Sequence, residues 1–444
     1  MPATDAFLTT PAIERIFSPV QRVQRMLDVE AALAEAQSAA GLLSAAERDA
    51  IVACCRAECF DAAQIIAAAV TAGNAAIPLV AALTGAVAQQ NPAAGDWVHW
   101  GATSQDILDT ATILQMRDAV ELVVADLSAA EARLADLTRL HQHTPMLART
   151  LLQPATAITL GYKLSLWGRG LAQARGGLLH LHKDAFALQL AGAVGTLSVL
   201  AADAGTIRRD TAAGLGLVDP LDGWHVQRDR MLAIGGALAA SIVVCAKMAR
   251  DLLLMMQPEV AEAAENAVTS GGSSAMPHKR NPVRALVPVA AAANVGGLMA
   301  SLYHCAVHEH ERAAGAWHGE WLVLPQLAAL AHASAAACAT LADGMVFSPD
   351  RMQANLDSNG GMVAAEALTA ALAAKIGKAA ARAGVEKLCA EVRAGGGTLA
   401  DCLTASATLS AHLSPAARAA VFGHVAAINA AVQSAGAWLA RRAT

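Results

Sequence analysis

The sequence predicts an all-α protein built around a bundle of long helices, and three observations support this. Hydrophobic residues make up 55% of the 444 residues but aromatic residues only 3%. Much of the apolar content is therefore alanine, the best helix former, which also lets helices approach closely. After Thr103 the chain repeats apolar residues at steps of three and four, and no convincing run of alternating strand residues appears anywhere. The repeated positions are Val120, Val123, Leu127, Ala130, Leu134 and Leu137, the seam of a long bundle helix.

This seam helix begins near Thr103, and Thr144-Pro145 ends it because the residue before a proline avoids helical geometry. His141 occupies the next position on the seam. Further helices are expected around 161–183, 231–257, 283–303 and 323–343. Breaks near 91–95 and 348–349 divide the chain into three predicted domains: an N-terminal helical domain (1–97), a central long-helix domain (98–348) and a small C-terminal helical domain (349–444).

Composition argues against two classes of partner. A net charge of −5 disfavours nucleic acid and anionic membranes. The most apolar stretches are 235–246, which stops at Lys247, and 327–341, which is mostly alanine and contains His332. We expect neither to span a bilayer and expect both to be buried, partly between subunits. Residues 1–5 lack the basic start of a signal peptide, which predicts a cytoplasmic protein.

Eight cysteines form no Cys-x-x-Cys pair. Cys54, Cys55 and Cys59 cluster on one apparent helix, where thiols can in principle hold a metal ion. No histidine or second thiol pair lies close in sequence, so reduced core thiols are the better interpretation.

The segment 271–282 is the most informative in the chain. Gly271 and Gly272 free the backbone, two hydroxyls follow at Ser273 and Ser274, and Lys279 and Arg280 add cations. Asn281-Pro282 is typical of a helix cap followed by the first helical residue. Such a loop can close over a small anionic substrate. The alternative is a flexible surface loop between helices.

Three other polar segments are candidates for binding. Thr103 with Asp106 fits a capping box, but an open helix start also offers amides to a carboxylate, with Thr103, Ser104 and Gln105 as ligands. Thr150 and Gln153 lie in a predicted loop that can orient a substrate.

The third segment is His308-Glu309-His310-Glu311-Arg312. On a helix, residues two apart point about 200° away from each other, so His308 and His310 are not expected to share a metal. The segment is either a solvated or interface face, or it carries Arg312 as a carboxylate clamp.

The loop from Gly272 to Pro282 resembles the signature of the fumarase/aspartase superfamily, Gly-Ser-Ser-x-Met-Pro-x-Lys-x-Asn-Pro, at every fixed position. The resemblance covers essentially the full length. It implies a three-domain, all-α fold and a homotetramer with a core of about twenty helices. It also implies active sites assembled from three chains, with no metal or organic cofactor. The matching segments are 72–80, 99–106, 224–230, 276–282, 308–312, 317–321 and 351–357.

Within the superfamily the chain is similar to the cycloisomerase branch. Lyases such as adenylosuccinate lyase carry Thr-His in the second segment, whereas this chain has Thr150-Leu151. The branch implies interconversion of 3-carboxy-cis,cis-muconate and its lactone, in protocatechuate breakdown by the β-ketoadipate route. Ala148, Pro154 and Ala157 also depart from the common pattern and affect the shape of this wall. The alternatives are an adenylosuccinate-type lyase and a non-catalytic structural homotetramer.

The resemblance also implies roles for individual residues. Ser273 is expected to transfer the proton, with Ser274 as the alternative and Lys279 stabilising the serine anion. His141 is either a second acid/base or a core histidine. The residues expected to bind the small tricarboxylate substrate are Thr103, Ser104, Gln105, Thr150, Gln153, Asn281 and Arg312.

Overall fold

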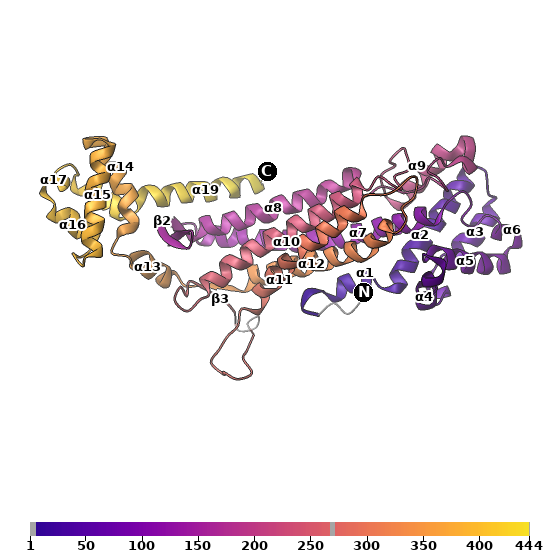
Figure 1. Ribbon diagram of the computed structural model, residues 1–444, viewed down its shortest axis with the longest axis horizontal. Coiled ribbons are helices and arrows are strands. Elements are labelled where there is room, and N and C mark those ends of the chain that lie inside the picture. Colours follow the sequence, from indigo (N-terminus) through magenta and orange to yellow (C-terminus); the bar gives the residue numbers. More distant parts are fainter. Residues whose placement is uncertain (1–5, 267–270, 444) are drawn as a thin grey trace. The chain divides into compact units, whose positions relative to one another are not determined.

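The computed structural model describes residues 6–266 and 271–443 of the chain. Residues 1–5, on which the prediction of no signal peptide rests, lie outside this part. The described chain is mostly helical (Figure 1), with only short strands. The all-α prediction is therefore confirmed.

Five long helices form the frame, and the sequence predicted each of them. The seam of α7 is buried as expected: Val120, Val123 and Leu127 are fully buried, and so are Ala130 and Leu134. The five helices are α7 (Ser104–Leu140), α8 (Leu160–Asp184), α10 (Asp229–Met255), α11 (Val283–Cys305) and α12 (Ala316–Gly344).

The chain divides into two compact units, and each long helix contributes residues to both. Unit 1 comprises Met1–Leu127, Gln173–Ala246 and Val287–Ala337; unit 2 comprises Ser128–Ala172, Lys247–Leu286 and Cys338–Thr444. The division into three sequence domains stays a prediction.

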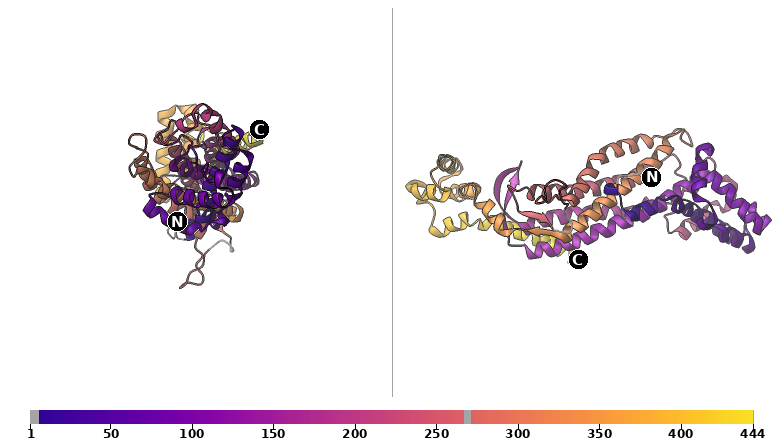
Figure 2. Two further views of the ribbon diagram at one scale, coloured as in Figure 1. Left: turned by 90° about the vertical axis from the view of Figure 1, so that its right-hand side faces the viewer. Right: turned by 90° about the horizontal axis from the view of Figure 1, so that it is seen from below.

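In unit 1, short helices pack around the parts of the five long helices that belong to this unit (Figures 1 and 2). Gly235 of α10 permits a close approach, since an added Cβ would lie 2.4 Å from Leu302 of α11. On α7, Asp126 lies 3.2 Å from His332 of α12. The shorter elements are η1 (Ala6–Leu8), α1 (Pro11–Ile16), α2 (Pro19–Ala39), α3 (Ala45–Cys54), η2 (Ala57–Cys59), α4 (Ala62–Ala72), α5 (Ala76–Gln90), α6 (Pro92–Gly95), η3 (Ser198–Asp203) and α9 (Ala204–Leu215).

The cysteine cluster does not share one helix as the sequence suggested. Cys54 is the last residue of α3, Cys55 follows as its cap, and Cys59 ends η2. All three thiols are free, and burial raises the pKa of the Cys55 thiol well above its usual value. A thiol held protonated is a poor nucleophile and metal ligand.

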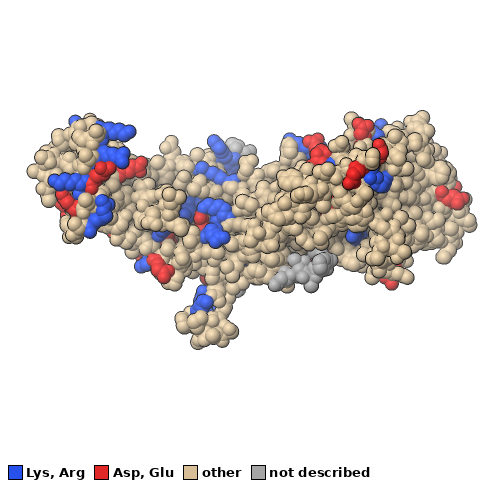
Figure 3. Space-filling model, in the orientation of Figure 1, with Lys and Arg blue, Asp and Glu red and all other residues tan. Residues whose placement is uncertain are grey.

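Unit 2 contains four short strands and the C-terminal helices. An apolar core joins α14 to α18 through Leu368, Leu372, Val385, Leu388 and Leu403, and charged side chains gather over α14–α16 in the view of Figure 3. The elements are β1 (Pro145–Thr150), β2 (Gln153–Thr159), β3 (Ala263–Glu265), β4 (Met345–Phe347), α13 (Pro349–Asp357), η4 (Met362–Ala364), α14 (Ala365–Ile376), α15 (Lys378–Arg393), α16 (Leu399–Ala405), α17 (Ala407–Ser410), α18 (Pro415–Phe422) and α19 (Val425–Ala443).

The segment after α7 is a β-hairpin, not the loop that the sequence predicted. β1 and β2 are antiparallel, with Thr150 opposite Gln153. Leu151 and Leu152 form the two-residue turn, with φ of 49° and 64°. Such turns need positive φ at both central residues and favour Asn-Gly, so two leucines gave no turn signal.

Three helices are apolar and long enough to span a membrane by length and composition: α10, α11 and α12. The expectation that the apolar stretches in α10 and α12 do not span a bilayer stays a prediction. The most apolar window of α12 is 72% buried inside the chain, against 44% for α10 and 33% for α11. Large apolar faces of α10 and α11 thus lie on the surface of the isolated chain.

Candidate active site

The first element of the site, in unit 1, is the start of α7. Thr103 immediately precedes the helix and Ser104 is its first residue. Both side chains are half-buried, and the amides of the first helical turn have no intrahelical acceptor. This start therefore offers two hydroxyls and a positive dipole end, which together suit a carboxylate.

Asp106 is an anchor beneath this helix start. Its carboxylate is fully buried and accepts hydrogen bonds from the amides of Thr103 (3.0 Å), Ala191 (3.0 Å) and Gly192 (2.9 Å). The Nε2 atom of His225 lies 2.7 Å away. The bond from Thr103 is the carboxylate half of the predicted capping box. The other contacts tie the helix start to two distant segments.

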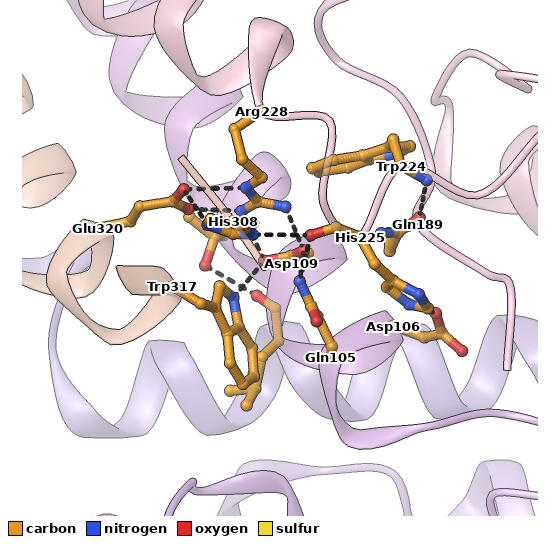
Figure 4. Close-up of polar contacts among 12 residues, drawn as sticks. Gln105, Asp106, Asp109, Gln189, Trp224, His225, Arg228, His308, Trp317 and Glu320 are labelled. Carbon is orange, nitrogen blue, oxygen red and sulfur yellow. Dashed lines mark hydrogen bonds and ion pairs between the residues drawn. The ribbon is translucent and has the colours of Figure 1, made fainter. Parts of the chain in front are cut away.

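A buried ion network continues one turn further along α7. Figure 4 shows Arg228 between Asp109 and Glu320. Its guanidinium donates two bonds to Asp109 (2.7 and 3.1 Å) and one of 2.9 Å from Nε to Glu320, with a second short contact from Nη2. Burial alone lowers the pKa of Arg228, but the two carboxylates outweigh it and raise the pKa. Trp317 donates to Asp109 at 2.9 Å, and the Trp224 ring lies 5.0 Å from the guanidinium.

Gln105 belongs to this network. Its side chain is fully buried and donates to Asp109 (3.0 Å) and to the carbonyl of His225 (2.9 Å). Of its two neighbours in the sequence, Ser104 is half-buried and Asp106 is buried. Within unit 1, Gln105 thus joins the helix start to the ion network.

The segment 308–312 lies between α11 and α12 and is not helical, so the helical argument about its histidines was wrong. His310 has φ of 47° and is exposed. His308 instead points into the network, with Nδ1 3.2 Å from the carbonyl of His225 (Figure 4). The Nη2 of Arg312 donates to the carbonyl of Ala193 at 2.8 Å. Ala191 and Gly192, in the same loop as Ala193, donate to Asp106 at the start of α7. Arg312 and the start of α7 therefore contact the same loop.

The second element of the site, in unit 2, is the tip of the β-hairpin. Thr150 and Gln153 are exposed and face each other across the turn. Leu151, in the histidine position of the lyases, is 96% exposed. Behind the tip, Arg149 makes a bidentate pair with the fully buried Glu262 (2.8 and 3.0 Å), which also accepts 2.9 Å from Asn355. These bonds hold the strand residue next to the turn, while Thr150, Leu151, Leu152 and Gln153 of the tip stay exposed.

The third element of the site is the loop 271–282, also in unit 2. Gly271 and Asn281 exchange backbone hydrogen bonds of 2.9 and 2.7 Å, and the Asn281 side chain donates 2.9 Å to the carbonyl of Gly272. The Oγ of Ser273 accepts from the amides of Met276 (3.1 Å) and Ala275 (3.4 Å). α11 begins at Val283, as expected for the helix around 283–303, and Pro282 precedes the helix instead of being its first residue.

Within this loop the predicted residues differ in exposure. Ser274 and Lys279 are exposed, whereas Ser273 and Asn281 are half-buried. The loop thus presents one hydroxyl held by amides and one exposed lysine, and the backbone pair of Gly271 and Asn281 closes its base.

His141 follows the last residue of α7, at the base of the hairpin. Its Nδ1 lies 3.2 Å from the hydroxyl of Thr144, and its ring packs edge-on against Phe347 at 5.5 Å. Burial lowers the pKa of the His141 imidazole. The ring is therefore neutral at pH 7 and suited to accept a proton.

Sequence reasoning assigned Asp106 only to the capping box and assigned no role to Asp109, Arg228 or Glu320, although these residues organise the unit 1 part of the site. One signal existed, because two aspartates three residues apart on an otherwise apolar helix face need buried partners. Their partners lie more than 80 residues away in the chain, which no local pattern reveals. Lys163 of α8 was also missed; burial lowers its pKa. Among the described residues, no group of three or more His, Cys, Asp or Glu could hold a metal ion.

Comparison with known proteins agrees with this arrangement. The model of the lyase family matches residues 7–297. The 3-carboxy-cis,cis-muconate cycloisomerase of Bradyrhizobium diazoefficiens is 43% identical, over 95% of this chain and 94% of the relative. The enzyme of the same name from Pseudomonas putida is 42% identical, over 92% and 98%.

A solved structure extends the likeness to the whole fold. The crystal structure of the 3-carboxy-cis,cis-muconate lactonizing enzyme from Pseudomonas putida superposes with a TM-score of 0.91 at 37% identity, covering 99% of this chain and 98% of that one. The chain thus belongs to the lyase family of the fumarase/aspartase superfamily.

Proposed function

We propose that this chain is a cycloisomerase that interconverts 3-carboxy-cis,cis-muconate and 4-carboxymuconolactone in protocatechuate catabolism by the β-ketoadipate pathway. Two relatives that carry this activity in their names are aligned over more than nine tenths of the chain. The observation that carries the chemistry is Ser273, whose Oγ accepts hydrogen bonds from two backbone amides.

The reaction places modest demands on the protein. In lactonisation a carboxylate oxygen of the substrate attacks a double-bond carbon, and a C–O bond forms. The electron pair moves toward the neighbouring carboxylate as an enolate-like anion, and one proton from solvent is then delivered to carbon. In reverse the leaving group is a carboxylate of pKa about 4, which departs without a proton. This explains how the site works with Leu151 in place of the lyase histidine, since a leaving amine needs a general acid far more.

Ser273 carries the proton in this proposal. The two amides stabilise negative charge on its oxygen, as in an oxyanion hole, and Lys279 is the cation that the same loop supplies in this proposal. Replacing Ser273 with alanine should lower kcat by at least about 100-fold. Ser274→Ala is the matched control, because that exposed hydroxyl has no hydrogen bond among the described residues. A larger loss for Ser274→Ala than for Ser273→Ala would reassign the proton to Ser274.

His141 is the second acid/base candidate. Because its pKa is lowered, it would act as a base, active once deprotonated. His141→Asn should then remove a limb on the acid side of the pH profile of kcat/KM. An unchanged profile with reduced stability would make His141 a core residue packed on Phe347.

Substrate binding needs cations and donors for three carboxylates. Unit 1 supplies the hydroxyls of Thr103 and Ser104, the α7 dipole and the guanidinium of Arg312, with Gln105 behind them. Unit 2 supplies Thr150 and Gln153 at the hairpin tip and Lys279 and Asn281 in the loop. We propose that these segments meet between chains of a homotetramer, one segment from each of three chains. The exposed apolar faces of α10 and α11 support such an assembly.

Hybrid tetramers test the shared site. Arg312→Met and Ser273→Ala chains, each inactive alone, should regain part of the activity when mixed after mild dissociation, because some sites then receive both intact segments. Formation of hybrids without any recovered activity would show that each site lies within one chain.

The substrate itself is the decisive test. Purified protein should remove the ultraviolet absorbance of 3-carboxy-cis,cis-muconate, because lactonisation destroys the conjugated diene, and should leave adenylosuccinate intact. Cleavage of adenylosuccinate alone would support the lyase alternative and keep the fold. Turnover of neither compound would favour a structural homotetramer. We further propose a cytoplasmic protein with three domains, in which α10–α12 face other subunits and not lipid.

A further inference from the structure

One buried histidine has no role in the function proposed above. His225 lies in the segment 224–230, one of those that match the superfamily, and is 3% exposed. Across residues 6–266 and 271–443 its ring makes one polar contact, in which Nε2 lies 2.7 Å from Oδ1 of Asp106. The other ring nitrogen, Nδ1, is buried and has no hydrogen-bond partner in the described part of the chain. The polar side of this ring therefore serves Asp106 alone.

The hydrogen in this contact lies on His225. A carboxylate oxygen only accepts hydrogen bonds, so Nε2 donates to Asp106, which is fully buried. Oδ1 of Asp106 also accepts from the amide of Ala191, and Oδ2 accepts from the amides of Thr103 and Gly192. A buried carboxylate with fewer donors is costly. Loss of the Nε2 donor should therefore favour entry of water and loosen the three amide bonds as well.

Asp106 connects this bond to two groups that the proposed function assigns to substrate binding. The first is the hydroxyl of Thr103, whose own amide donates to Asp106 at 3.0 Å. The second is the guanidinium of Arg312, which donates to the carbonyl of Ala193 at 2.8 Å. Ala193 directly follows Gly192, whose amide donates to Asp106 at 2.9 Å. The position of both groups thus depends on a carboxylate that stays in place.

The backbone around His225 is held independently of its ring. The amide of Trp224 donates to Oε1 of Gln189 at 2.9 Å, and the carbonyl of His225 accepts from Nε2 of Gln105 at 2.9 Å (Figure 4). Neither bond involves the imidazole. A change of the His225 side chain should therefore remove the bond to Asp106 and leave the segment in place.

We propose that His225 is a positioning residue for the substrate, acting through Asp106 on Thr103 and Arg312. This inference rests on the proposed function, in which Thr103 and Arg312 bind the substrate. Ser273, which carries the proton there, belongs to unit 2 and makes its hydrogen bonds within its own loop. Loss of the His225 bond should therefore raise KM and leave kcat nearly unchanged, the pattern of a change in binding and not in chemistry.

Two amide replacements of His225 separate this bond from the mere presence of a polar side chain. The Nε2 of glutamine lies as many bonds from Cβ as the Nε2 of histidine, whereas the Nδ2 of asparagine corresponds to Nδ1, which has no partner. His225→Gln can still donate to Asp106 and should keep KM for 3-carboxy-cis,cis-muconate within about 3-fold of the wild type. His225→Asn should raise KM about 10- to 100-fold with kcat within about 3-fold.

His332→Asn is the matched control. His332 is also a buried histidine of unit 1, and its Nε2 lies 3.2 Å from an aspartate of α7, Asp126. Asp126 lies far along the helix from Thr103, so this variant should leave KM unchanged. An equal rise of KM in His332→Asn and His225→Asn would mean a general loosening of unit 1 and would overturn the proposal.

The glutamine variant gives a second way to overturn the proposal. A folded His225→Gln protein with KM raised more than about 10-fold would show that the donor to Asp106 is not what matters. A loss confined to kcat in His225→Asn would place His225 in the chemistry and not in positioning.

Hydrogen exchange followed by mass spectrometry tests the same inference without substrate. Peptides that cover 99–106 and 188–195 should exchange at least about 10-fold faster in His225→Asn than in His225→Gln. Wild-type exchange in both variants would refute the positioning role. A wild-type protein that does not turn over carboxymuconate would refute the proposed function instead, and faster exchange in His225→Asn alone would still support the hold of His225 on the start of α7.

Discussion

Replacement of Asp106 by asparagine should loosen the loop at 191–192. Asparagine keeps one oxygen, which can still accept from the amides of Thr103 and Gly192. Its NH2 group then faces His225, whose ring can change tautomer to accept, and the amide of Ala191, which cannot. The Ala191 amide is left buried without an acceptor, at a cost of about 1–3 kcal/mol.

The other two backbone bonds also weaken, because they now end on a neutral oxygen. Charge-assisted hydrogen bonds are roughly twice as strong as neutral ones, so each loses about 1 kcal/mol. The sum is about 3–5 kcal/mol for a carboxylate that is fully buried. If the lost free energy lowers the cost of opening this loop locally, the amides of Ala191 and Gly192 should exchange hydrogen at least about 100-fold faster than in the wild type.

Hydrogen exchange followed by mass spectrometry measures this directly on peptides that cover 188–195. Asp118→Asn is the matched control on the same helix, because Asp118 pairs with Arg25 near the surface, where an ion pair contributes at most about 1 kcal/mol. Wild-type exchange of Ala191 and Gly192 in the Asp106→Asn protein would refute the anchoring role. The same variant should lower kcat/KM for carboxymuconate, since Thr103 loses its fixed position.

Three further predictions follow from the same structure. Replacing Leu151-Leu152 by Asn-Gly should raise the free energy of unfolding by about 1–2 kcal/mol, because leucine is strained at positive φ and Asn-Gly is not. An unchanged or lower urea midpoint would mean that the turn carries no strain. Burial lowers the pKa of His99, but the Glu30 carboxylate 2.7 Å away more than offsets this and raises it. The pair therefore stabilises the protein fully below pH about 6.5 and loses this contribution as pH rises through the raised pKa, a dependence that His99→Asn should flatten in urea titrations at stepped pH. Treatment with a chelator should leave carboxymuconate turnover unchanged, and a loss restored by added zinc or magnesium would introduce a metal into the mechanism.

The sequence predicted the long helices well because their signal is local. The α7 seam repeats over five turns, and each of its positions is buried, so burial and periodicity agree along one element. The helix ends were also close, since Pro145 and the Gly-rich loop interrupt the periodic pattern. Such features need no knowledge of which segments meet in space.

The hairpin and the ion network could not be read in the same way. β1 has an irregular burial pattern, and a bulge opposite Ala148 breaks the alternation. Arg228 meets Asp109 across 119 positions of the chain and Glu320 across 92. For the ion network, the trace in the sequence was charge on an apolar helix, and for the hairpin the turn at Leu151-Leu152 left no turn signal.

The paired backbone of Gly271 and Asn281 has a consequence for how the loop 271–282 tolerates change. The pair clamps the loop at its base, and the two residues with assigned chemistry, Ser273 and Lys279, each lie two positions from a clamped residue. The middle of the loop is the part farthest from the clamp. Residues inserted after Pro277 would replace the hydrogen-bonded turn from Met276 to Lys279 at this tip and leave the clamp in place, and the entropy of a closed loop grows slowly with its length. Natural or engineered length variation should therefore concentrate there, while the spacing from Gly271 to Ser273 stays constant.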